Sequence, residues 1–429
     1  MLVSQLCRCT RPLKTAPSWL LVGNRSGTNS SLLTRQLITS TRCGNSRIGY
    51  KGLRINEIIK SNGIVARFCS SAPKPKTPKV VGYWLLGCSG MVFTAVVLGG
   101  VTRLTESGLS MVTWKLLGEK MPRSEDEWQR EFEKYQQYPE FKYKNQHITL
   151  SEFKWIWFME FAHRTWGRAI GAAVLLPAAG FWLRGCLDRG MKIRVAVYCT
   201  LVAAQGLMGW YMVKSGLEDR FQGPADVPRV SQYRLAAHLG LAFVLYAALL
   251  GGALRVLRPQ PPLAVLRKGV KELKSVTILA HSVKALAFFT ALSGAFVAGL
   301  DAGLVYNSFP KMGDHWVPED ILALSPTLRN LTENPTTVQF DHRVLGTATL
   351  AAASLLWLRA RKAPLSAPAA RVAAAVGAMA WLQVTLGVLT LLHYVPTPLA
   401  ASHQAGSLTL LTLAIWLTHE VKLLKFIPK

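Results

Sequence analysis

Eight apolar blocks of about 20 residues constrain the fold of this chain more than any other feature of its sequence. A bilayer core about 30 Å thick is crossed by roughly 20 helical residues at 1.5 Å each, and half of the 429 residues are hydrophobic. The blocks therefore predict an all-α membrane protein with eight transmembrane helices. The predicted spans are residues 82–101, 160–183, 194–213, 235–254, 276–299, 342–358, 371–393 and 400–418.

The first 69 residues have the composition of a mitochondrial transit peptide. Residues 1–79 contain one acidic residue, Glu57, against fourteen Lys and Arg, and no apolar block that could span a bilayer. The segment Arg67-Phe68-Cys69-Ser70-Ser71 offers a processing site, so we predict a mature N-terminus near Ser70. A disordered basic arm is the alternative interpretation.

The net charge of +27 is concentrated in this leader and in alternate loops between the predicted helices. That pattern excludes nucleic acid as a partner and follows the positive-inside rule, which places the basic loops on the matrix side. Both termini of the mature chain are then predicted to lie in the matrix. The basic segments are residues 74–79, 184–194, 255–274, 359–371 and 422–429.

The chain repeats itself. Gly99-Gly100 leads to Glu106-Ser107-Gly108-Leu109 as Gly294-Ala295 leads to Asp301-Ala302-Gly303-Leu304. Four helices per repeat is an even number, so the halves must share one orientation and be related by a pseudo-twofold axis along the membrane normal. The predicted parts are a leader (1–69), a matrix-side segment (70–81), an N-terminal four-helix half (82–254), a matrix linker (255–275), a C-terminal four-helix half (276–420) and a matrix tail (421–429).

The long outer loop before residue 160 is rich in aromatic and charged residues. Residues 124–137 are predicted to be helical. The aromatic run that follows predicts an interfacial belt at the membrane surface. This run comprises Trp155, Trp157, Phe158, Phe161 and Trp166.

Four histidines occupy equivalent places, His163, His238, His342 and His403, each predicted within the first turns of an even-numbered helix and so at the outer face. Ionisable groups at membrane depth are costly and usually serve a site. Two imidazoles from facing helices suit the axial positions of a haem. Zinc is disfavoured because no third or fourth ligand recurs with the pair. For any one histidine, a hydrogen-bonded interfacial imidazole is the alternative.

Arginine and glycine accompany the histidines. Arg164 and Arg343 follow them directly and Arg168 lies one turn further, so they could pair with haem propionates. Snorkelling to the interface explains these arginines equally well. Gly167 and Gly346 lie one turn after a histidine, where a flat ring could approach, although small-residue helix packing also accounts for them.

The halves differ at one chemically decisive place. Glu160 precedes His163 by three residues, on the same helical face, whereas Gln339 holds that place before His342. Glutamine keeps the shape but cannot take a proton. The N-terminal half can therefore use a carboxylate as acid, base or charge stabiliser. A solvated carboxylate favoured by the helix dipole is the alternative for Glu160.

With these motifs the chain resembles the haem A synthases, specifically the mitochondrial form needed to assemble cytochrome c oxidase. The resemblance covers residues 80–420 and depends on Glu-x-x-His-Arg at 160–164, Gln-x-x-His-Arg at 339–343 and the partners His238 and His403. It implies oxidation of the C8 methyl of haem O to a formyl group, which gives haem A, at the intermembrane-space face of the mitochondrial inner membrane.

The resemblance also implies roles and partners. The substrate is haem O, the product haem A and the cofactor haem b. Haem O synthase and a ferredoxin-type electron donor are the implied protein partners, alongside membrane lipid, and a homo-oligomer is left open. The implied residue roles are catalysis by Glu160, substrate haem binding by His163, His238, Arg164 and Arg168, axial ligation of haem b iron by His342 and His403, and cofactor binding by Arg343.

Two other classes of function remain open from the residues alone. A non-enzymatic haem protein, either a di-haem electron carrier or a haem chaperone, fits the histidines but needs no acid on one side only. A solute transporter fits eight spans but not the histidine quartet.

Overall fold

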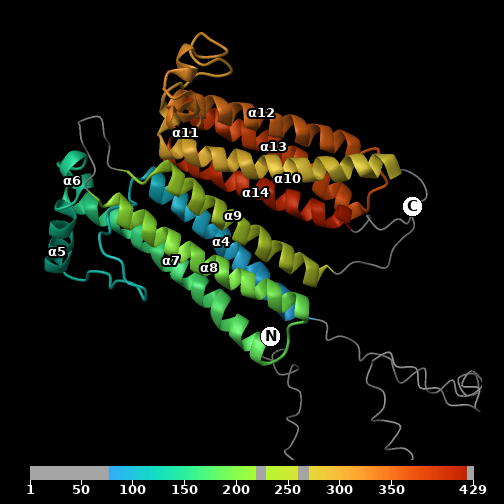
Figure 1. The fold of residues 1–429 in the computed structure, drawn as a ribbon, viewed down its shortest axis with the longest axis horizontal. Helices are drawn as coiled ribbons and strands as arrows, with labels where there is room; N and C mark the ends of the chain where they lie inside the picture. Colours follow the sequence, from blue (N-terminus) through green and yellow to red (C-terminus); the bar gives the residue numbers. More distant parts are fainter. Residues whose placement is uncertain (1–76, 219–228, 259–269, 423–429) are drawn as a thin grey trace, which may run out of the picture. The chain divides into compact units, whose positions relative to one another are not determined.

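The computed structural model describes residues 77–218, 229–258 and 270–422, and in these residues eight long helices and no strand form the framework (Figure 1). The predicted transit peptide and cleavage site, and parts of the predicted linker and tail, lie outside the described residues. The long helices are α4 (Lys79–Leu104), α7 (Leu150–Leu183), α8 (Arg189–Gly216), α9 (Gln232–Leu257), α10 (Val270–Gly299), α12 (Pro335–Ala360), α13 (Ala367–Leu392) and α14 (Thr397–Lys422).

The eight helices form two closed four-helix bundles, which correspond to the two predicted halves. In the first, α4 packs against α7 and α9, and α8 closes the ring between α7 and α9. In the second, α10 packs against α12 and α14, and α13 closes the ring. The bundles meet where α9 packs on α10 and where α14 packs on α4 and α9 (Figure 1). The order of helix contacts is therefore the same in both halves.

Six of the described helices, α4, α7, α8, α9, α10 and α13, are long and apolar enough to cross a membrane. Helices α12 and α14 also contain 26 residues each but are less apolar. Polar residues at their beginnings, such as Gln339 and Gln404, account for part of the difference. The structure thus describes a multi-pass membrane protein with six spans by length and composition.

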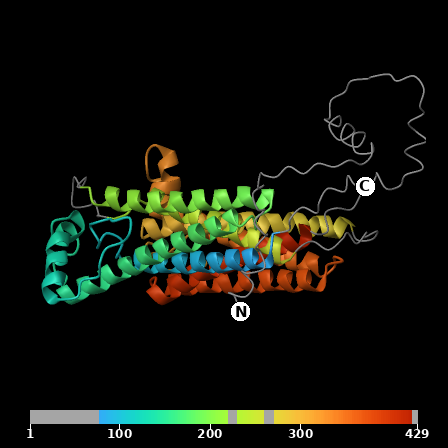
Figure 2. The ribbon, with the colours of Figure 1, turned by 90° about the horizontal axis from the view of Figure 1, so that it is seen from below.

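Both halves place their long connecting segments at the same end of the bundles (Figures 1 and 2). Arg103 at the end of α4 binds Asp301, which follows α10, at 2.7 Å. Glu106 and Asp301, matched in the sequence repeat, both adopt left-handed backbone angles, with φ of 53° and 54°. Such angles are uncommon for residues other than glycine. The loop after the first helix therefore takes the same turn in both halves.

A folded cap covers the beginning of α7. Helix α5 (Glu125–Gln136) confirms the helix predicted in this loop and is followed by α6 (Pro139–Tyr143). Helix α7 contains 34 residues, about 51 Å at 1.5 Å per residue, so it extends well beyond a bilayer core. A capping box fixes its start, because Thr149 and Glu152 each bond the other's backbone N–H, at 3.3 and 2.9 Å. The cap packs on the extra turns.

The predicted aromatic belt is wrong for Trp157, which is 1% exposed. It stacks on Phe161 with ring centroids 5.1 Å apart and meets Trp128 of α5 edge-on. Trp157 belongs to the core of the cap, together with Phe132 and other buried residues. Sequence alone could not separate these interpretations, because the helix starts ten residues before the predicted span and buries this face under α5.

Candidate functional site

The four histidines predicted to carry chemistry all lie on the second and fourth helices of their half. His238, His342 and His403 lie about two turns from the starts of α9, α12 and α14, as predicted. The prediction is wrong for His163, which lies more than three turns into α7 because that helix begins at Leu150. Each of the four residues is half-buried.

Each histidine packs against a glycine of the first or third helix of its half. A Cβ atom built at Gly99 would lie 2.8 Å from Cε1 of His163, and one at Gly387 would lie 2.8 Å from Cε1 of His403. The corresponding distances are 3.2 Å from Gly294 to His342 and 3.6 Å from Gly209 to His238. The lack of a side chain thus lets these rings approach the helix backbone.

These four glycines are the site residues that sequence reasoning missed. The signal was present, because Gly99 matches Gly294 in the repeat and Gly209 matches Gly387 in a repeated Gln-x-x-x-Gly motif. The glycines singled out instead, Gly167 and Gly346, contact no histidine: a Cβ at either would have no atom of the described residues within 4 Å. Their predicted role beside a flat ring stays a prediction.

In the C-terminal half the two imidazoles face each other. The ring centroids of His342 and His403 are 6.3 Å apart and the ring planes are nearly perpendicular, at 85°. Two metal–nitrogen bonds of about 2 Å, together with half of each ring, span roughly this distance. In the described residues no group of three or more His, Cys, Asp or Glu could hold a metal. The pair therefore fits an iron whose four other ligands come from a porphyrin.

Hydrogen bonds orient both rings of this pair. Nδ1 of His342 lies 2.8 Å from Oγ of Ser293, and Nδ1 of His403 lies 3.1 Å from the backbone oxygen of Gln383. Nδ1 of His403 also lies 3.1 Å from the side-chain Nε2 of Gln383, so the backbone oxygen and the side-chain amide of Gln383 both contact this nitrogen. Among the described residues Nε2 of neither ring has a hydrogen-bond partner, which leaves this atom for a metal. Metal-ligating histidines are usually held in this way.

In the N-terminal half the same nitrogens have no such support. Nδ1 of His163 and Nδ1 of His238 are buried and have no hydrogen-bond partner in the described part of the chain. Gln205 does repeat one contact of Gln383: its Nε2 donates to the backbone oxygen of His238 at 3.1 Å, as Nε2 of Gln383 donates to the backbone oxygen of His403 at 2.8 Å. The histidines therefore occupy the same positions in both halves. Hydrogen bonds to Nδ1 orient the rings in the C-terminal half but not in the N-terminal half.

Glu160 is buried, with 3% exposure, so the interpretation as a solvated carboxylate is wrong. Its Oε2 accepts from Oγ of Ser110 at 2.9 Å and from the backbone N–H of Met111 at 2.8 Å. Its Oε1 pairs with Arg164, one turn further along α7. Arg164 in turn donates to the backbone oxygens of Met111 and Thr113, at 2.8 and 2.7 Å. The pair thus fixes residues 110–113 over the helix.

Gln339 and Arg343 form the matching arrangement in the other half. There the side chain at the position of Glu160 donates hydrogen bonds to the loop, whereas Glu160 accepts them. Nε2 of Gln339 donates to the backbone oxygens of Ala302 and Tyr306, at 2.8 and 3.2 Å. Arg343 donates to Oε1 of Gln339 and to Tyr306, both at 3.0 Å. A carboxylate could not donate to these two carbonyls. The change from glutamate to glutamine therefore has two consequences. It changes the chemistry of the side chain, and it matches the backbone groups of the loop that the side chain holds, an N–H at Glu160 and carbonyls at Gln339.

The predicted propionate-binding arginines all have protein partners. Besides the contacts of Arg164 and Arg343, Arg168 donates to the backbone oxygen of Lys115 at 2.7 Å and pairs with Glu119 at 3.0 Å. Nη1 of Arg168 and Nε of Arg343 are buried and have no partner among the described residues. Both nitrogens can donate to another group, and propionate binding stays a prediction.

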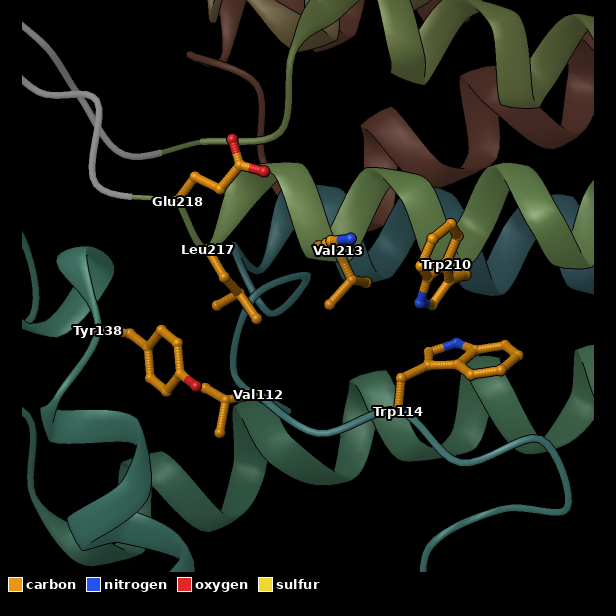
Figure 3. Close-up of a pocket in the computed structure, with 8 residues that line it drawn as sticks. Val112, Trp114, Tyr138, Trp210, Val213, Leu217 and Glu218 are labelled. Carbon is orange, nitrogen blue, oxygen red and sulfur yellow. The ribbon is translucent and has the colours of Figure 1, made fainter.

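A hollow of about 400 Å³ lies at the cap end of the N-terminal half, between the loop that Arg164 holds and the end of α8 (Figure 3). Trp114 and Trp210 face each other across it, and Val213 and Lys214 of α8, with Leu217 just after that helix, line its wall. Val213 lies one helical turn from Gly209, the glycine that faces His238. This amphipathic surface therefore lies on the same helix as the glycine that contacts His238.

Comparison with known proteins identifies the family. The model of the family described as cytochrome oxidase assembly protein matches residues 82–415, which contain all eight long helices in whole or in part. The chain belongs to this family. It is 53% identical to heme A synthase COX15 of Mus musculus over 409 residues, 94% of this chain and 96% of the relative.

Similarity extends to other mammals and to bacteria. The identity to heme A synthase COX15 of Homo sapiens is 56% over 369 residues, 86% of this chain and 88% of the relative. Heme A synthase of Nitrosospira multiformis is 45% identical over 345 residues, 80% of this chain and 94% of the relative.

Proposed function

We propose that this protein is a haem A synthase of the mitochondrial inner membrane, an oxidoreductase that converts the C8 methyl of haem O to a formyl group for cytochrome c oxidase assembly. The names of its relatives support the activity, and the basic, acid-poor leader supports the compartment. The observation that carries the proposal is the His342–His403 pair, which faces across 6.3 Å in one half while the other half combines two histidines with a buried carboxylate.

The proposed topology has eight spans, with both mature termini in the matrix. Helices α12 and α14 would span because they are as long as their neighbours and complete the second bundle. The basic loops then lie on the matrix side. The histidines, near the end that carries the cap, would lie at the intermembrane-space face.

The C-terminal half is proposed to hold the resident haem b through Nε2 of His342 and Nε2 of His403. Haem b supplies one-electron transfer when it is bound. The chain's own part is to orient both imidazoles: Ser293 and Gln383 hold the Nδ1 sides, and Gly294 and Gly387 let the rings stand close to the helices. Arg343 retains one buried nitrogen, Nε, for a carboxylate of the cofactor.

The N-terminal half is proposed to bind haem O with His163 and His238, beside Glu160. Glu160 can stabilise positive charge that develops at the oxidised carbon, because Arg164 and the N–H of Met111 hold its carboxylate in one place. Arg168 offers Nη1 to a propionate. The electron donor is proposed to be a ferredoxin-type protein and the supplier of haem O a haem O synthase.

Glu160→Gln tests the role of the carboxylate. We expect haem A production to stop while total bound haem stays near that of the wild type, measured by extraction and chromatography of haems after expression with a haem O supply. Ser110→Ala is the matched control, because it removes one hydrogen bond to Glu160 and keeps the carboxylate. Normal haem A production by Glu160→Gln would exclude Glu160 from the chemistry. Equal inactivity of both variants would mean that Glu160 acts by holding the loop.

Histidine variants test the assignment of the halves. His342→Ala and His403→Ala are expected to lose the resident haem, whereas His163→Ala should lose turnover and keep that haem. The absorption spectrum and the haem-to-protein ratio of the purified protein measure this. Equal loss of haem in all variants would refute the assignment. Retained haem without any haem A in the wild type would favour a non-enzymatic haem carrier.

A further inference from the structure

The difference between the two histidine pairs can be traced to one side chain. Gly99 and Gly294 face His163 and His342 at matched positions of the repeat. The residue before each glycine differs, since Ser293 precedes Gly294 whereas Leu98 precedes Gly99. Ser293 contacts Nδ1 of its histidine, and Leu98 has no polar atom to offer. Nδ1 of His163 accordingly has no partner in the described residues.

Hydrogen-bond counting determines what Ser293 does to His342. A serine hydroxyl has one proton to donate. Oγ of Ser293 lies 2.8 Å from the backbone oxygen of Thr290, which can only accept, so the proton goes there. The contact of 2.8 Å to Nδ1 of His342 must then use a lone pair of the serine oxygen. His342 therefore carries its proton on Nδ1, which leaves the lone pair of Nε2 for a metal.

We propose that Ser293 is the positioning residue that makes the C-terminal site retain its haem, and that Leu98 at the matched place leaves the N-terminal site free to exchange its haem. This inference rests on the proposed function. A resident cofactor needs a ligand held in one tautomer, whereas a substrate must enter and a product must leave. A second-sphere hydrogen bond also raises the basicity of the imidazole, which strengthens its bond to iron.

Gln383, which contacts His403, does not account for the difference between the halves. Nδ1 of His403 lies 3.1 Å from the backbone oxygen of Gln383 and 3.1 Å from the side-chain Nε2 of the same residue. Gln383 is also matched by Gln205 in the N-terminal half, where the histidine nitrogen nevertheless lacks a partner. Both Ser293 and Gln383 thus touch a ligand ring, but Gln383 is matched by a glutamine in the other half whereas Ser293 is matched by Leu98.

Ser293→Ala in the full-length protein tests the proposal. Loss of such a partner typically costs about 10- to 100-fold in affinity, so transfer of the resident haem to excess apomyoglobin should be faster by about that factor. The reduction potential should rise, because a less basic ligand favours ferric iron less. The electron paramagnetic resonance signal should change as well, since it reports ring orientation. Ser293→Thr, which keeps the hydroxyl, should restore all three properties.

Ser354→Ala is the control, because Oγ of Ser354 is buried in the same half without a partner among the described residues. It should leave haem transfer unchanged. Leu98→Ser is the reciprocal variant and should slow release of haem from the N-terminal half. Unchanged haem transfer, potential and resonance signal in Ser293→Ala would refute the inference. Failure of the proposed function would look different: the wild type would bind no haem that depends on His342.

Discussion

Gly387→Ala should displace His403, because the new methyl group has no room. Its Cβ would lie 2.8 Å from Cε1 and 3.3 Å from Nε2 of that ring. Carbon atoms in good contact are about 3.5 to 4.0 Å apart, so the ring must move by roughly 0.7 Å. Metal-binding side chains need to be held within about 0.5 Å of their working geometry. The displacement is therefore large enough to disturb an axial ligand.

The effect on stability should be much smaller than the effect on haem. Replacing glycine by alanine inside a helix gains up to about 1 kcal/mol in propensity. Overpacking costs about 1 to 3 kcal/mol, so the net loss is expected to be about 0 to 2 kcal/mol. The displaced ring would also lengthen the 3.1 Å contact from Nδ1 to the oxygen of Gln383. A folded protein with little bound haem is the expected result.

The other glycines make a graded series with built-in controls. The distance to the nearest histidine atom is 2.8 Å at Gly99, 3.2 Å at Gly294 and 3.6 Å at Gly209. Alanine at Gly209 should thus be tolerated, and alanine at Gly346, with no atom of the described residues within 4 Å, should be neutral or slightly stabilising. Haem-to-protein ratios and thermal unfolding in detergent measure both effects. Full haem content in Gly387→Ala, or equal loss in Gly346→Ala, would refute the reasoning.

Two further predictions concern the outer segments. Burial raises the pKa of Glu140 from 4.5 to about 8. Between pH 4.5 and 8, Glu140 is therefore protonated in the folded cap and ionised in the unfolded chain. The stability of the cap should fall as pH rises from about 4.5 to 8, by at most roughly 5 kcal/mol. Glu140→Gln should flatten this pH dependence, measured by tryptophan fluorescence during unfolding. If the slope persists in Glu140→Gln, the pH dependence belongs to another group. Asp301 binds Arg103 at 2.7 Å and Arg229 at 3.2 Å, and because these side chains are partly exposed, Asp301→Asn should lower stability by about 1 kcal/mol or less. The difference in stability between Asp301→Asn and the wild type, measured by thermal unfolding, should shrink at high salt. If no difference appears at low salt, the ion pairs of Asp301 do not contribute to stability.

Helix α7 shows which features local sequence information predicts and which it does not. The apolar block from residue 160 predicted a span, and the region 124–137 predicted α5 with almost its observed bounds. The ten residues before 160 continue the same helix, but their aromatic face is buried by α5. Such burial depends on a partner distant in the sequence, so the start of the helix and the role of Trp157 could not be predicted from periodicity.

By itself, the sequence determined that this chain is a helical membrane protein of two matched halves with four equivalent histidines. These properties depend on block length, charge and repeat spacing, which are local and additive along the chain. Only the tertiary structure decided which glycine faces which histidine, that Glu160 is buried against residues 110–111, and that Ser293 orients His342 while Nδ1 of His163 has no partner in the described residues. The reason is physical: a hydrogen bond depends on distances of a few tenths of an ångström between helices, and spacing along one helix does not specify them.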